Sequence, residues 1–147
     1  MTRRRVYVPL TADGLTGLAT SRQAGPAPVQ GFAAPGGASE QAAEQVEHEA
    51  WLAAAGAARS LVSVGARRVI GSADVDSALI EELAVIQPGS LGRPPVPAGP
   101  VRVVVGAPIP LRHFVSFHVD EEPEGVDEDL LWYDVTELSE VLALLIS

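Results

Sequence analysis

Three side chains stand where a small α/β protein often places groups for chemistry. Asp13 and Asp74 each follow an apolar, strand-like run, and His118 lies in a His–Val–Asp step. Carboxylates at strand ends are often functional, and an imidazole can transfer protons near neutral pH. Either aspartate would also suit the N-terminal cap of a following helix. Asp13, Asp74 and His118 are therefore the catalytic candidates, with a structural role as the alternative for each.

A run of carboxylates at residues 120–129 partly resembles a calcium-binding loop. Counted from Asp120, acidic residues stand at positions 1, 3, 5 and 9, and glycine stands at position 6, as in an EF-hand. Position 12 is Leu131, where an EF-hand has a bidentate glutamate. Asp120, Glu122 and Glu124 are the metal-ligand candidates, but the preferred interpretation is a solvated acidic loop that holds no metal.

Several common catalytic motifs are missing from the sequence. The chain has no cysteine, which excludes disulfides, thiolate nucleophiles and cysteine-based zinc sites. Ser72 lacks the Gly-x-Ser-x-Gly elbow of a hydrolase, and Gly36 and Gly37 lack the later residues of a phosphate-binding loop. We therefore expect no cofactor, and we favour a protein without catalytic activity.

The charge and the apolar runs limit the partners. The formal net charge is −9, which argues against binding nucleic acid through a general phosphate-neutralising surface. No apolar run approaches the roughly 20 residues of a membrane helix. The arginines at residues 3–5 precede an apolar run that is too short for a signal peptide and contains Pro9. The sequence thus predicts a cytoplasmic protein with no membrane partner.

The longest predicted element is a helix over residues 38–64. Ser39 is its expected N-cap and Gly65 its expected stop. Gly56 predicts either a break or a close contact between helix and sheet. Apolar residues recur at helical spacing along it: Val46, Ala50, Ala53, Ala57, Leu61 and Val64.

The rest of the chain alternates between predicted strands and helices. The strands are expected at residues 5–10, 29–33, 67–70, 101–105 and 130–135, with a turn at 71–74. The helices are expected at residues 11–20, 77–86, 111–119 and from 136 onward. The run at 101–105 is apolar enough to predict burial on both faces and a central place in the sheet.

These elements predict one α/β or α+β domain spanning residues 1–147. We expect a mixed sheet of four or five strands, with the long helix and the C-terminal helix packed on it. Loops are expected at about 21–37, 88–100 and 120–129, where proline, glycine or acidic residues concentrate.

Two neighbouring aromatic residues are the candidates for an interaction surface. Trp132 and Tyr133 lie side by side on a predicted strand, so they point to opposite faces of the sheet. One of them is expected in the core and the other at the edge of a pocket or interface, with Tyr7 as a neighbour.

Several short motifs together resemble a family of small actinobacterial proteins of unknown function. They are the opening residues 5–11 (RVYVPLT), the APIPL run from Ala107, the step from His118 to Asp120, and residues 130–138 (LLWYDVTEL). The resemblance spans most of the chain and implies a cytoplasmic actinobacterial protein. It implies no activity, cofactor or site residue.

The leading hypothesis is a non-catalytic protein-interaction or regulatory module. Its partner would be another protein or a second copy of the chain, because the acidic and proline-rich loops suit surface contacts. The alternative is a small-molecule-binding protein or enzyme with a site at the C-terminal ends of the strands. That alternative requires Asp13, Asp74 and His118 to converge on one cleft.

Overall fold

The computed structural model describes residues 2–34, 40–61, 67–83, 100–120 and 130–146. Within these residues, seven strands form one antiparallel sheet in the order β5-β6-β3-β1-β4-β8-β9. The strands are β1 (Arg3–Leu10), β3 (Val29–Ala33), β4 (Val69–Asp76), β5 (Ile80–Glu82), β6 (Val101–Val105), β8 (Phe114–Asp120) and β9 (Leu130–Asp134). The fold is therefore α+β. Its described sheet is antiparallel and not mixed as predicted, and it is larger than the four or five strands expected.

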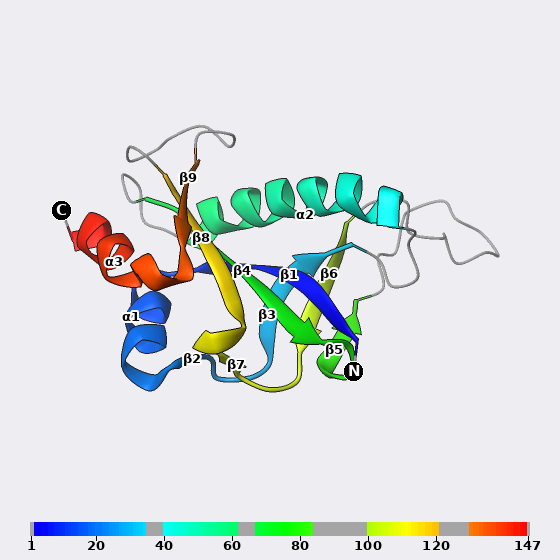
Figure 1. Ribbon diagram of the computed structural model, residues 1–147, viewed down its shortest axis with the longest axis horizontal. Helices are drawn as coiled ribbons and strands as arrows, with labels where there is room; N and C mark the ends of the chain where they lie inside the picture. The colour runs from blue at the N-terminus through cyan, green and yellow to red at the C-terminus, as the bar shows by residue number, and fades with distance from the viewer. Residues whose placement is uncertain (1, 35–39, 62–66, 84–99, 121–129, 147) are drawn as a thin grey trace.

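The sheet is covered on both faces (Figure 1). Helix α2 (Glu40–Leu61) packs on one face. The other face carries α1 (Ala12–Ser21), α3 (Leu138–Ile146) and a ribbon of β2 (Gln23–Ala24) and β7 (Ile109–Pro110). The two helices expected on the sheet thus lie on opposite sides of it.

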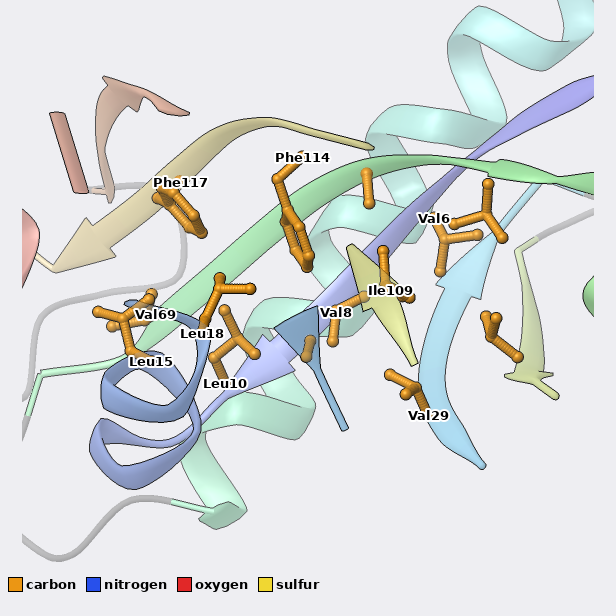
Figure 2. Close-up of a cluster of buried hydrophobic side chains, with 14 of the residues drawn as sticks. Val6, Val8, Leu10, Leu15, Leu18, Val29, Val69, Ile109, Phe114 and Phe117 are labelled. Carbon is orange, nitrogen blue, oxygen red and sulfur yellow. The ribbon is translucent and has the colours of Figure 1, made fainter. Parts of the chain in front are cut away.

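The larger core lies between the sheet and α1 (Figure 2). Val6, Val8 and Leu10 alternate along β1, so all three point to this side. Leu15 and Leu18 meet them from α1 and are 0% exposed. Helix α1 begins as predicted, because the Thr11 hydroxyl accepts a hydrogen bond from the Gly14 amide at 2.9 Å.

Helix α2 packs closely on the opposite face through small side chains. Ala50, Ala54 and Ala58 are each 0% exposed and contact a core that includes Tyr7 and Ile70. Gly56 is exposed and its Cα faces open space, so neither the predicted break nor a close contact occurs there. The predicted cap residues Ser39 and Gly65 lie outside the described residues.

The turn predicted at residues 71–74 is wrong, and so is the helix predicted at 77–86 as far as the described residues extend, to residue 83. Strand β4 continues through the expected turn to Asp76, and a short 3-10 turn then leads into β5. Gly71 provides space rather than a bend, because a Cβ there would lie 2.5 Å from Cε1 of Phe114. The glycine therefore lets an aromatic ring lie across the neighbouring strand.

The helix predicted at residues 111–119 was also wrong. A 3-10 turn (Leu111–His113) is followed by β8, whose pairing with β4 shifts register between Ser72 and Ala73. This β-bulge brings Phe114 and Phe117 to the same face, where their rings stack at 5.7 Å. The bulge therefore lets two apolar residues that are three positions apart lie on the same face of a strand.

Strand β6 is not central. It lies second from one edge of the sheet, between β5 and β3, and its burial alternates. Val101, Val103 and Val105 are buried, whereas Arg102 is exposed. The apolar run correctly predicted a strand, but hydrophobicity alone did not show which strands flank it.

A fully buried ion pair joins β8 to the residue that precedes β4. The Arg68 guanidinium donates to Asp120 through Nε (3.0 Å to Oδ2) and Nη2 (2.8 Å to Oδ1), and both side chains are 0% exposed. The Arg68 amide donates to Asp120 Oδ2 at 2.7 Å. Nη1 of Arg68 also donates to the Ala55 carbonyl in α2, at 3.3 Å. One arginine therefore connects two strands and a helix.

Replacing Asp120 by asparagine should destabilise the protein by about 3–5 kcal/mol, because it leaves a buried guanidinium without a counter-charge. Urea denaturation measures the loss. Asp74→Asn is the matched control, since it breaks the half-exposed Arg5–Asp74 pair and should cost less than about 1 kcal/mol. Equal losses in the two variants would show that burial adds nothing to the Arg68 pair.

Two glycine-to-alanine variants should have opposite effects. A Cβ on Gly31 would meet Val6 Cγ1 at 2.6 Å and the Tyr7 carbonyl oxygen at 3.0 Å, so Gly31→Ala should destabilise by about 1–3 kcal/mol. Gly56→Ala meets nothing within 4 Å and should stabilise α2 by roughly 1 kcal/mol. Thermal unfolding of both variants checks the pair, and a stabilising Gly31→Ala would refute the close strand approach.

Candidate functional site

An open hollow of about 460 Å³ lies between the first half of α2 and four strands of the sheet, and we call it the polar groove. Its sheet side is formed by Arg5 and Tyr7 of β1, Ser72 of β4, Ser116 and His118 of β8, and Trp132 of β9. Its helix side is formed by Glu44, His48 and Trp51 of α2. The residues that line it are therefore mostly polar or aromatic.

The bulge in β8 determines which side chains face this groove. Beyond the bulge, Phe117 and Val119 point to the α1 side, and Ser116 and His118 point to the α2 side. The Ser72 hydroxyl lies 3.3 Å from Nε2 of His118 across the two strands. The groove thus contains a fixed contact between a hydroxyl and an imidazole.

His118 is held in its neutral form. Burial and, to a smaller extent, the positive charge of Arg5 together lower the pKa of its imidazole to about 4. At neutral pH the ring therefore carries no charge. It can accept or donate one hydrogen bond at each nitrogen, according to its tautomer.

The single guanidinium that lines the groove is already paired. Arg5 donates from Nε to Asp74 Oδ1 at 2.6 Å and from Nη2 to Oδ2 at 3.3 Å, and this pairing raises the pKa of Arg5. Burial raises the pKa of Tyr7, and the nearby Glu47 carboxylate raises it too. Tyr7 therefore remains a neutral phenol at physiological pH.

Aromatic rings form the helix wall of the groove. His48 and Trp51 stack with centroids 5.9 Å apart and planes at 15°. Trp51 also meets His118 edge-on, with centroids 5.5 Å apart and planes at 71°. The indole nitrogen of Trp51 is buried and has no hydrogen-bond partner in the structure as described. Such unpaired buried donors are rare in folded proteins.

The two aromatic residues of β9 point to opposite faces, as predicted. Tyr133 packs against the core on the α1 side. Trp132 is 59% exposed, lies opposite His118 in the strand register, and lines the groove with Tyr7. Tyr7 lies on β1, which β4 and β8 separate from β9, so the two side chains line the same groove without being strand neighbours.

The three catalytic candidates do not form one cluster. Asp13 lies in the first turn of α1, on the opposite side of the sheet from the groove. Asp74 is connected to the groove through its ion pair with Arg5, and His118 lines the groove directly. Adjacent strands run antiparallel, so their C-terminal ends alternate between the two opposite ends of the strands and do not gather on one side.

The metal-ligand candidates are described only in part. Both carboxylate oxygens of Asp120 accept hydrogen bonds from Arg68, and the side chain is 0% exposed. Glu122 and Glu124 lie outside the described residues. Within the described part of the chain, no group of three or more His, Asp or Glu side chains is arranged to hold a metal.

The contact between Ser72 and His118 resembles part of a hydrolase triad, but its surroundings do not complete one. Ser72 is 1% exposed and belongs to a strand that is paired on both sides. Asp74 is bound to Arg5, and no described carboxylate hydrogen-bonds to His118. The arrangement therefore suits a polar binding surface better than a nucleophile.

Most residues of the groove were not among the candidates predicted from the sequence. Ser72 and Ser116 are polar residues next to apolar ones within strands, and this pattern is a signal that could have pointed to them. His48 is exposed, and it also stacks on Trp51. Helical spacing places residues 44, 48 and 51 on one side of α2.

A second hollow, of about 350 Å³, lies beneath the other half of α2. It is lined in part by Phe32 and by Arg102, whose guanidinium carbon lies 5.9 Å from the Phe32 ring centroid. Leu61 and Leu83 also line it, and each directly precedes residues outside the description. We assign no site there.

The fold and the groove define a class of α+β protein, in which a helix-covered antiparallel sheet leaves a polar groove beside the helix. The chain belongs to a family of unknown function, DUF6912, whose model matches residues 4–142. This match confirms the resemblance to an uncharacterised family, and an actinobacterial origin stays a prediction. Neither the curated proteins nor the solved structures gave a match. No described helix is long and apolar enough to cross a membrane.

The low pKa of His118 should make stability depend on pH. Its pKa is about 4 when folded, against 6.5 for an unperturbed histidine, so between these values the unfolded chain binds more protons. Stability should be fully present above pH 6.5 and should fall by at most about 3 kcal/mol as the pH drops to 4. His118→Gln should lack this component, which urea denaturation of both proteins across that range would measure. An imidazole that titrates near pH 6.5 by NMR would contradict this prediction.

Proposed function

We propose that this protein binds a small molecule in the polar groove and does not catalyse a reaction on it. The observation that carries the proposal is the gathering of polar and aromatic side chains from four strands and a helix around one open hollow of about 460 Å³. Small-molecule sites commonly have volumes of about 300–1,000 Å³ and a few converging polar groups.

The polar composition of the groove supports this proposal. Ser72 and Ser116 are buried on a face that α2 covers elsewhere through alanines. Burying polar groups and keeping a histidine neutral both cost free energy, and apolar side chains would pack a helix on a sheet without that cost. A ligand that hydrogen-bonds to these groups would explain why they are present.

A second candidate function is protein interaction, which sequence analysis favoured. Trp132 is 59% exposed and Leu131 is 36% exposed, and both belong to β9, an edge strand of the described sheet. Exposed aromatic and aliphatic residues on a strand edge suit pairing with another protein or a second copy of the chain. In that case Trp132 would contact the partner, and the helix wall of the groove would not.

A screen of a small-metabolite library by ¹H–¹⁵N NMR tests the proposed function. The sequence contains two tryptophans, and both line the groove, so their indole N–H signals report on it directly. A ligand of the groove should shift both indole signals together with backbone amides of β8. Shifts scattered over the surface, or none across the library, would refute the proposal.

Variants on the exposed face of α2 then separate the two functions. His48→Ala removes part of the helix wall and should weaken a groove ligand about fivefold, a loss of roughly 1 kcal/mol. Glu49→Ala is the matched control, because Glu49 is an exposed neighbour that does not line the groove. Protein interaction through β9 should be insensitive to both variants and lost in Trp132→Ala.

A further inference from the structure

The aromatic residues of this protein are concentrated at the polar groove. Aromatic side chains make up 5% of the sequence, yet both tryptophans and one of the two tyrosines line this single hollow. Two of the three histidines line it as well. A ligand there would therefore meet mostly ring faces and ring edges.

The rings surround the hollow from both sides. Trp51 stands on the helix wall, and Trp132 stands on β9 across the groove beside His118. The edge-on contact of Trp51 with His118 fixes one indole, whereas the exposed Trp132 leaves its surface open to solvent and ligand. Tryptophan rings attract cations more strongly than other aromatic side chains do.

The charge around the groove is negative. Glu44 lines it, and Glu47 lies close enough to raise the pKa of Tyr7. Arg5 is the one cation among the described lining residues, and Asp74 binds it through two hydrogen bonds. Three carboxylates thus accompany one guanidinium, and the imidazole of His118 adds no positive charge at neutral pH.

From these observations we propose that the groove binds a small organic cation, such as a substituted ammonium group, between Trp51 and Trp132 and near Glu44. This inference rests on the proposed function and names the chemical class of the ligand. Quaternary and alkylated ammonium groups are recognised by aromatic rings together with a carboxylate at their edge.

Other ligand classes fit the same groove less well. An anion would meet Glu44 and the negative charge of the nearby Glu47, and its most obvious partner, Arg5, is already paired. An uncharged apolar ligand would cover polar side chains of the groove, such as Ser116 and His118, without offering them a hydrogen bond, which costs free energy. A cation that carries a hydroxyl or another polar group satisfies both the rings and these side chains.

Binding of choline and of its uncharged carbon isostere, 3,3-dimethylbutan-1-ol, tests the inference. The two probes have nearly the same shape and the same hydroxyl, so they differ mainly in charge. We expect choline to bind about three- to thirty-fold more tightly, which corresponds to the usual range of a cation–π contact. Titration followed by the two indole N–H signals gives both dissociation constants.

Variants of the carboxylates and of Trp132 test which side chains cause the preference for choline over its isostere. Glu44→Gln combined with Glu47→Gln should weaken choline several-fold and leave the isostere unchanged, and the loss should shrink at high salt. Glu140→Gln is the matched control, because it removes an exposed carboxylate from α3, on the opposite side of the sheet. Trp132→Ala should weaken choline more than the isostere, and its exposed position makes loss of folding a minor concern.

Each outcome separates this inference from the proposed function. Tighter binding of choline that depends on Glu44 and Glu47 supports the inference. Equal or tighter binding of the isostere overturns it and leaves small-molecule binding in place. Binding of neither probe also overturns it, and the proposed function then fails only if the metabolite library produces no shifts at the groove.

Discussion

The buried pair of Arg68 and Asp120 is the interaction on which the rest of the structure depends. A guanidinium and a carboxylate that are both 0% exposed can coexist only if each satisfies the other. The Arg68 amide donates to the Asp120 carboxylate and the Asp120 amide donates to the Arg68 carbonyl, so the start of β4 is fixed against the end of β8. The same guanidinium holds the Ala55 carbonyl, so α2 is located relative to that register.

The register matters because it decides what the groove contains. Side chains alternate along a strand, so a shift of one residue would turn Ser116 and His118 toward the α1 side and Phe117 toward the groove. The bulge near the start of β8 also determines which of its side chains face the groove. The ion pair and the bulge together fix which side chains of β8 face the groove and which face α1.

Local pattern was enough to predict much of the fold. The helix spacing at residues 40–61 and the strand patterns of β1, β3, β6 and β9 predicted the right element at nearly the right residues. The failures occurred where a longer-range contact decided the outcome. Gly71 resembles a turn residue until the ring of Phe114 is placed over it, and the residues after His113 form a strand because they pair with β4 and β9.

The candidate site was less predictable, since it is assembled from distant parts of the chain. His118, Trp132 and Tyr7 were recognisable as residue types, and the contrary directions of Trp132 and Tyr133 follow from strand geometry alone. Ser72, Ser116 and Trp51 join them only through the pairing of β1 with β4 and of β4 with β8, and through the placement of α2. Asp13 was misleading because α1 turns to the opposite face after β1.

The position of β1 at the middle of the sheet has a consequence for how the chain folds during synthesis. β1 pairs with β4 along its whole length, from Arg3 opposite Asp76 to Leu10 opposite Val69. The ribosome therefore makes the central strand more than fifty residues before its main partner. Until β4 emerges, one edge of β1 has no strand to pair with. Its apolar face stays exposed unless α1, which follows it immediately in the chain, packs against it. Early docking of α1 on Val6, Val8 and Leu10 would thus act as an internal chaperone for the strand.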